Sequence, residues 1–141
     1  MKRIQYDKYG GPELMRLEDF ELPPPGQGEV AVKVKFAAIN PIDWKVRNGY
    51  LKMVTGKVFP RAMGSDLSGT VISVGPDVTR FKPGDAVFGL ARLKESGALG
   101  HAVVTHETFL APKPDDVSFE DAACLGTQVS RRGTAWWTKR S

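Results

Sequence analysis

The stretch MGSDLSGTVISVGPDVTRFKPGDAVFGL, residues 63–90, alternates extended segments with tight turns. Its β-branched run TVISV at 70–74 suits a pleated strand, and GPD at 75–77 ends that run with three turn-forming residues. The sequence KPGD at 82–85 has proline and then glycine at its two central positions, as a type II turn requires. A second apolar run, AVFGL, follows at 86–90. The stretch therefore predicts two strands and a tight reversal within a β-barrel or sandwich.

The composition is that of a globular domain without a membrane segment. The chain has 141 residues, 41% of them hydrophobic and 26% charged, which is enough for one domain with a sizeable core. Every apolar run is shorter than the roughly 18 residues of a membrane-spanning helix, and the start MKRIQYDKYG lacks the apolar centre of a signal peptide. The single cysteine, Cys124, fits a reducing compartment such as the cytoplasm, and we expect it to be a small buried side chain.

The net charge of +4 comes from the C-terminal segment. Residues 1–126 carry 16 basic and 16 acidic side chains, so this part of the chain is neutral. A nucleic-acid-binding domain presents its basic residues as a patch on the folded surface. Here the surplus is a short basic tail, which argues against a nucleic-acid partner, and its four residues are Arg131, Arg132, Lys139 and Arg140.

Alternation of apolar and polar residues predicts further strands at 2–6, 15–22 and 29–39, and two short strands at 102–105 and 108–111. The segment 29–39 has the clearest period of two. It places one set of side chains on the buried face of the strand, namely Val30, Val32, Val34 and Phe36, and leaves Lys33 and Lys35 on the opposite face.

Two short helices complete the expected elements. Asn40 is a suitable N-cap for a helix that proline enters at its first turn and that Gly49 ends. Ser118 is the expected cap of a second helix with acidic residues in its first turn. The segments 52–62 and 92–100 are interpreted as loops, the second of them at the surface.

Three blocks of sequence resemble one protein family in the right order. They are NPID at 40–43 with RxG at 47–49, then GxDxxGTV at 64–71 with FxxGDxV at 81–87, and finally LAPKP at 110–114 with SFEDAA at 118–123. The chain resembles the N-terminal domain of the medium-chain dehydrogenase/reductase superfamily, in its zinc-free quinone oxidoreductase-like or enoyl reductase-like branch. The resemblance implies a mainly β fold with a few short helices, a GroES-like and partly open β-barrel.

The resemblance also bears on metal binding. Zinc-dependent members of the superfamily have a cysteine at the position of Asn40 and a His-Glu pair at the positions of Ser65 and Asp66. Amide and hydroxyl groups are poor zinc ligands compared with thiolate and imidazole. The four cysteines that hold a second zinc in those relatives are also missing from 92–100. We therefore expect no zinc.

The activity implied by the resemblance is hydride transfer from NADPH to a quinone, enone or enoyl acceptor. The expected cofactor-binding residues are Asn40 and Thr134, and the expected substrate cleft contains Asn40, Asp43, Tyr50 and Asp66. Each has a structural alternative: Asn40 as a helix cap, Asp43 in an ion pair with Arg47, Tyr50 as a half-buried aromatic residue, and Asp66 in local hydrogen bonds.

The two histidines, His101 and His106, favour structural roles. They lie five residues apart on chain that is expected to be extended, which suits no metal-binding helix spacing. His101 occupies a position at which relatives often carry glutamate, but a loop or strand-edge role is favoured over acid–base catalysis.

The domain organisation follows from the same resemblance. We expect a GroES-like substrate-side domain at 1–125 and, at 126–141, the start of a helix that crosses toward a Rossmann domain. The chain has no glycine-rich dinucleotide-binding turn, so the Rossmann domain is expected to be absent. The alternative to an active reductase is an inactive fragment that binds a partner, or itself, through an exposed apolar face at Trp136 and Trp137.

Overall fold

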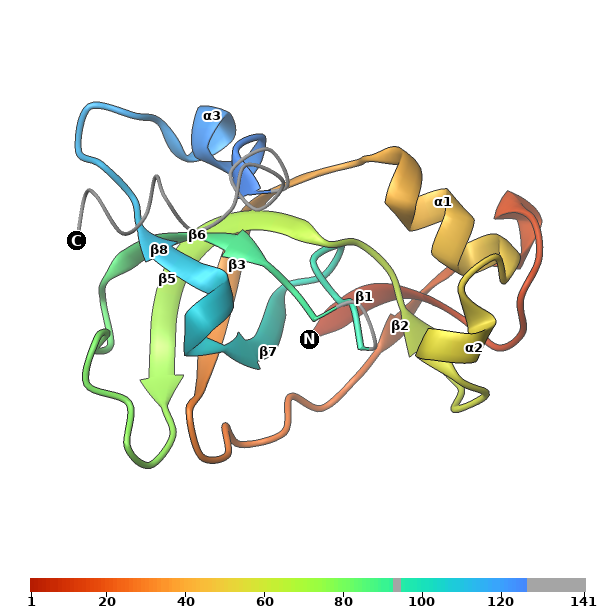
Figure 1. Cartoon of the computed structure of the whole chain (residues 1–141), viewed down its shortest axis with the longest axis horizontal. Helices are drawn as coiled ribbons and strands as arrows, with labels where there is room; N and C mark the ends of the chain where they lie inside the picture. Colours follow the sequence, from red (N-terminus) through yellow and green to blue (C-terminus); the bar gives the residue numbers. More distant parts are fainter. Residues whose placement is uncertain (93–94, 127–141) are drawn as a thin grey trace.

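The chain forms two antiparallel sheets in a computed structural model that describes residues 1–92 and 95–126 (Figure 1). The larger sheet has the strand order β7-β3-β5-β6-β8, and the smaller has the order β2-β1-β4. The larger sheet consists of β3 (Glu29–Ala38), β5 (Asp66–Val74), β6 (Ala86–Leu90), β7 (Ala102–His106) and β8 (Leu110–Pro112). The smaller consists of β1 (Lys2–Tyr6), β2 (Arg16–Asp19) and β4 (Arg61–Ala62).

Short helices lie at the edges of these sheets. They are α1 (Pro41–Asn48), α2 (Lys52–Thr55) and α3 (Phe119–Ala123), with 3-10 turns at Pro12–Leu14 and Glu107–Phe109. The helices α1 and α2 flank the smaller sheet, and α3 lies against the larger one (Figure 1). The sheets do not close on each other, so the expected fold class, mainly β and partly open, is confirmed. Each helix in the described part of the chain is too short and too polar to span a bilayer.

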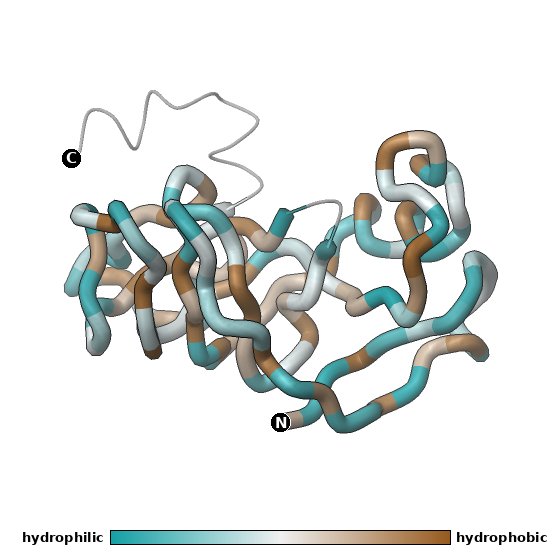
Figure 2. Tube along the Cα trace, turned by 90° about the horizontal axis from the view of Figure 1, so that it is seen from below, coloured by the Kyte–Doolittle hydropathy of each residue, from teal (hydrophilic) through white to brown (hydrophobic). Residues whose placement is uncertain are grey.

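The central strand β5 joins the two halves of the larger sheet. It pairs with β3 on one side and β6 on the other. Figure 2 shows short hydrophobic and hydrophilic stretches following one another along the trace of the chain. Apolar side chains of these strands and of β8 fill the interior, and the fully buried ones include Val30, Val32, Leu67, Val87 and Leu110.

The turns of the 63–90 stretch form as expected. The N–H of Asp85 donates to the carbonyl of Lys82 at 3.1 Å, and Gly84 between them has a φ of 96°. That φ is left-handed, so glycine is the residue that the turn tolerates best.

The strand β3 departs from its expected alternation at one point. Its register against β5 shifts between Val34 and Phe36, so Lys35 is an extra residue in the ladder. A bulge of this kind reverses the faces of the residues that follow it. Phe36 is accordingly 42% exposed, and its prediction as a buried residue was wrong.

The segment 92–100 was predicted as a surface loop, and its described residues 92 and 95–100 include a buried part. Ala98 is fully buried in the core, and its N–H donates to the carbonyl of Gly64 at 3.2 Å. Leu99 bonds on the side of the smaller sheet, because its N–H donates to the carbonyl of Met63, just after β4, and its carbonyl accepts from the N–H of Ile4 in β1 at 2.8 Å. These contacts place the segment between the sheets.

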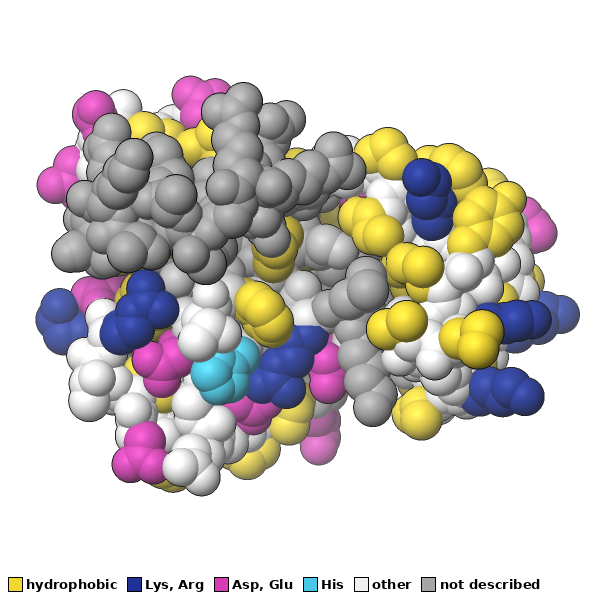
Figure 3. Space-filling view, in the orientation of Figure 1, with side chains coloured by type: hydrophobic (Ala, Val, Ile, Leu, Met, Phe, Trp, Pro, Cys, Tyr) yellow, Lys and Arg dark blue, Asp and Glu magenta, His cyan; other side chains and the backbone are white. Residues whose placement is uncertain are grey.

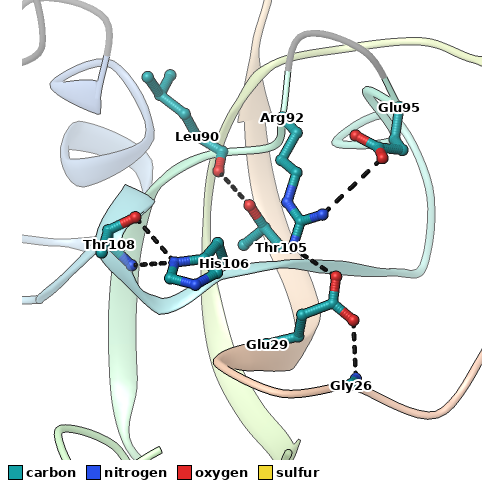
Figure 4. Close-up of polar contacts among 8 residues, drawn as sticks. All are labelled: Gly26, Glu29, Leu90, Arg92, Glu95, Thr105, His106 and Thr108. Atoms are coloured by element: carbon teal, nitrogen blue, oxygen red, sulfur yellow. Dashed lines mark hydrogen bonds and ion pairs between the residues drawn. The ribbon is translucent and has the colours of Figure 1, made fainter.

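An ion pair holds the start of this segment to β3. Arg92 pairs with Glu29, and its second nitrogen lies 3.9 Å from Glu95 (Figure 4). Close by, the hydroxyl of Thr105 donates to the carbonyl of Leu90 at 2.9 Å, while Glu29 also accepts from a backbone N–H at 2.7 Å. This network joins β3, β6 and β7 at one end of the larger sheet.

Both histidines make hydrogen bonds at strand ends. His106 caps the turn after β7, where its ring nitrogen lies 2.9 Å from the hydroxyl of Thr108 (Figure 4). His101 accepts from the backbone N–H of Lys2 at 3.0 Å. The expected strand at 108–111 is therefore β8, which begins only after this turn, and the strand expected at 15–22 is the shorter β2.

The last described element, α3, begins at its expected cap. The hydroxyl of Ser118 accepts from the N–H of Asp121 at 3.1 Å, and Ala122 and Ala123 face the sheet. Cys124, however, is exposed, so its prediction as a buried residue was wrong. It is the C-cap of α3, one residue past the end of the helix.

Candidate functional site

The helix α1 places the first functional candidate at its N-terminus. Asn40 is the N-cap, and Asp43 closes a capping box by accepting from the backbone N–H of Asn40 at 2.8 Å. At the other end Gly49 has a left-handed φ of 90°, and its N–H donates to the carbonyl of Val46. Local sequence chemistry thus determines where α1 begins and ends.

Four polar side chains meet at the start of α1, where β5 also begins. The amide nitrogen of Asn40 donates to a carboxyl oxygen of Asp66, and the hydroxyl of Ser65 donates to Asp43 at 3.1 Å. We call Asn40, Asp43, Ser65 and Asp66 the polar cluster. Three of the four residues expected in the substrate cleft therefore lie together, although 26 residues of chain separate Asn40 from Asp66.

The polar cluster opens to the surface through Asn40. Asn40 is half-buried, whereas Asp43 is 4% exposed, Ser65 is 6% exposed and Asp66 is fully buried. Burial raises the pKa of Asp43, and the hydrogen bonds from Asn40 and Ser65 oppose that rise. A ligand that approaches the cluster meets the Asn40 amide first, with two carboxyl groups behind it.

The end of the described chain approaches the same place. A methyl group on Gly126 would lie 2.7 Å from the carbonyl oxygen of Gly89 and 2.9 Å from Asp66. Such distances leave no room for a side chain, so glycine is required there. Sequence reasoning missed Gly126 and the hydroxyl of Ser65 as neighbours of the cluster, and the adjacency of Ser65 to Asp66 was the available signal.

Tyr50 does not join the polar cluster. It follows α1 at the end opposite Asn40, about 15 Å away along the helix axis. Its side chain is 67% exposed, and its ring packs edge-on against Trp44 with centroids 5.8 Å apart. Figure 3 shows apolar side chains gathered over α1 and α2. The exposed large hydrophobic residues in and between these helices include Trp44, Tyr50, Met53 and Val54.

The expected ion pair between Asp43 and Arg47 was also wrong. The carboxyl group of Asp43 accepts hydrogen bonds from the N–H of Asn40 and the hydroxyl of Ser65. Arg47 donates instead to the carbonyl of Gly10 at 3.1 Å. Thr134, Trp136 and Trp137 lie outside the described residues.

Asp43 gives the site a testable pH dependence. Because burial raises its pKa, the folded chain binds this proton more tightly than the unfolded chain does. Protonated Asp43 therefore makes its full contribution to stability at a pH below the ordinary aspartate pKa. This contribution is lost as the pH rises through the raised pKa of the folded chain. We expect Asp43→Asn, which cannot ionise, to gain stability relative to the natural chain as the pH rises from the ordinary aspartate pKa, about 3.9, through the raised pKa. Thermal unfolding of both proteins across this range measures the difference, and a difference that does not change with pH would contradict the assignment.

Residues 26–115 match the alcohol dehydrogenase GroES-like domain. The chain belongs to this family. Residues outside the match complete the barrel, since β1 and β2 precede it and α3 follows it.

Several of the similar proteins are quinone oxidoreductases. The chain is 35% identical over 126 residues to a chloroplastic quinone-oxidoreductase homolog of Spinacia oleracea, covering 89% of this chain and 38% of that protein. The quinone oxidoreductase of Coxiella burnetii superposes with a TM-score of 0.86 at 31% identity, over 96% of this chain and 44% of that one. The Escherichia coli quinone oxidoreductase complexed with NADPH superposes with a TM-score of 0.78 at 31% identity, over 87% of this chain and 36% of that one.

These matches confirm the resemblance to quinone oxidoreductases of the medium-chain dehydrogenase/reductase superfamily. The chain spans less than two fifths of the length of the spinach relative.

Proposed function

We propose that the chain forms the acceptor-side part of a zinc-independent oxidoreductase that transfers a hydride from NADPH to a neutral quinone or enone. The observation that carries the proposal is the polar cluster, in which a half-buried asparagine amide is backed by buried carboxyl groups. The similarity to quinone oxidoreductases, one of them complexed with NADPH, supports both the cofactor and the acceptor class.

The residues of the polar cluster have a chemistry that fits this cofactor. NADPH, when bound, supplies the hydride. Asn40 offers an amide that can pair with a carboxamide or carbonyl oxygen, and Asp66 fixes its orientation by accepting from the amide nitrogen. When ionised, Asp43 and Asp66 favour a positively charged nicotinamide ring and disfavour an anionic acceptor. The cluster therefore suits a neutral carbonyl acceptor.

The donor set also supports a mechanism without zinc. The cluster offers an amide, a hydroxyl and two carboxyl groups, with neither the thiolate nor the imidazole ligands that catalytic zinc sites use. Both carboxyl groups already accept hydrogen bonds within the cluster. In this proposal the protein works by orienting cofactor and acceptor.

A hybrid enzyme tests the proposed function. This chain would replace the similar part of the Escherichia coli quinone oxidoreductase, which leaves the remainder of that protein in place. We expect the purified hybrid to oxidise NADPH when benzoquinone or methyl vinyl ketone is added. The matched control is the remainder of the Escherichia coli protein alone, which should oxidise NADPH no faster than the background.

The acceptor spectrum decides between the two acceptor classes. A hybrid that reduces benzoquinone but not methyl vinyl ketone assigns the chain to quinones, and the reverse assigns it to enones. A folded hybrid that binds NADPH and reduces neither acceptor would overturn the proposal.

A further inference from the structure

A separate groove lies between α1 and the β1–β2 hairpin. It encloses about 450 Å³, within the range of small-molecule sites. No residue of the polar cluster lines it. Its walls are mostly apolar, and they include Ile4, Met15, Leu17, Ile39, Trp44 and Leu99.

Two of the apolar side chains that line the groove are largely exposed to solvent. Leu17 is 60% exposed and Ile39 is 72% exposed, and both line the same groove. A ligand that covers both side chains removes their apolar area from water, which favours binding by roughly 25 cal/mol for each Å² buried. The indole of Trp44, 40% exposed, gives one wall a flat aromatic surface.

Arg47 supplies the groove with a charge. It is only 8% exposed, yet it forms no ion pair with a carboxylate of the described residues. Its Nε makes one good hydrogen bond, to the carbonyl of Gly10. The other two nitrogens have weak contacts, at 3.9 Å from the sulfur of Met15 and 3.5 Å from the amide oxygen of Asn48. Buried charges in proteins are normally paired, so this guanidinium retains capacity for an anion.

The second arginine at the groove differs in this respect. Arg16 pairs with Asp7 and with Glu18, the latter at 2.8 Å, so its charge is already balanced. The unbalanced positive charge of the groove is therefore that of Arg47.

We propose that this groove binds a small molecule with a flat apolar body and one carboxylate. The apolar body packs on Trp44, Leu17 and Ile39, and the carboxylate pairs with the outer nitrogens of Arg47. A planar guanidinium and a carboxylate match in a two-point hydrogen-bonded pair, which accounts for the preference for a carboxylate over a single oxygen. This site is independent of the hydride-transfer function proposed for the polar cluster.

Naphthoate and its neutral analogue naphthamide test the proposal on the 141-residue chain. Both probes share the flat apolar ring, but only naphthoate carries the charge. In an NMR titration we expect saturable shifts of the Trp44 indole N–H, with naphthoate bound about tenfold more tightly than naphthamide. Equal affinity for the two probes, or no saturable shift at Trp44, would overturn the proposal.

Two exposed substitutions locate the site. Leu17→Glu places a carboxylate at the groove, and we expect it to weaken naphthoate binding by about tenfold. Val58→Glu is the matched control, because Val58 is 77% exposed and lies outside the groove. Unchanged binding in Leu17→Glu, or equal losses in the two variants, would show that the probe binds elsewhere.

Arg47→Lys tests the paired contact itself. The variant keeps the charge but loses the planar fork, so the preference for naphthoate over naphthamide should fall to about threefold or less. Thermal unfolding of this variant shows whether it is folded. A folded variant with an undiminished preference would contradict the role of Arg47.

Discussion

Gly69→Ala should destabilise the chain by about 3 kcal/mol or more. A methyl group on Gly69 would lie 2.0 Å from the carbonyl oxygen of Lys33 and 3.1 Å from a methyl carbon of Val32. The obstacle is backbone of the neighbouring strand β3, so no side-chain rotation relieves it. The pairing of β3 with β5 must open, and this pairing holds the centre of the larger sheet.

Urea unfolding measures this effect, and Gly11→Ala is the matched control. Gly11 has extended backbone, with a φ of −80°, and a methyl group there meets only the flexible side chain of Glu13. We expect the control to be neutral or to stabilise by up to about 1 kcal/mol. Equal midpoints for the two variants would contradict the close approach of β5 to β3.

Phe88→Ala should cost about 3–5 kcal/mol. Phe88 is fully buried between the sheet and α3, in a cluster with Ala111 and Ala122. Its loss leaves a cavity under α3, the helix that leads to Gly126 beside Asp66. We therefore expect faster exchange of the Ala122 amide hydrogen in addition to a lower urea midpoint.

Phe36→Ala removes the same side chain from an exposed position and is the control for this prediction. Because Phe36 is 42% exposed, the expected loss is about 1 kcal/mol or less. Similar losses for Phe88→Ala and Phe36→Ala would show that Phe88 does not anchor α3.

The features that sequence reasoning predicted well are those determined by neighbouring residues. The turn at Gly84, the cap at Ser118 and the two ends of α1 each depend on backbone geometry within a few residues. The strands β3, β5 and β6 were predicted for the same reason, since the period of two in β3, the β-branched run in β5 and the apolar run in β6 are each visible in a short window.

The features that it missed depend on contacts between distant parts of the chain. Ala98 is buried because the segment around it bonds to Gly64, a partner that no local pattern indicates. Phe36 is exposed because one extra residue in β3 shifts the register against β5. Arg47 bonds to Gly10, 37 residues away, instead of pairing with Asp43 on its own helix.

The candidate site was predictable in part. The resemblance to quinone oxidoreductases indicated Asn40, Asp43 and Asp66, and the structure brings these three side chains together. Their roles in binding remain a prediction. Tyr50 was named from the same resemblance, but the length of α1 separates it from the polar cluster.

The most direct test of the polar cluster as the reaction site is the rate of the hybrid enzyme with Asn40→Ala. Asn48→Ala, at the opposite end of α1, is the matched control. The account predicts that Asn40→Ala lowers kcat/KM for NADPH-dependent benzoquinone reduction by about 100-fold, as loss of a positioned hydrogen-bonding group does in other enzymes. Asn48→Ala should stay within about threefold of the unsubstituted hybrid. A folded Asn40→Ala hybrid with the unsubstituted rate would contradict the account.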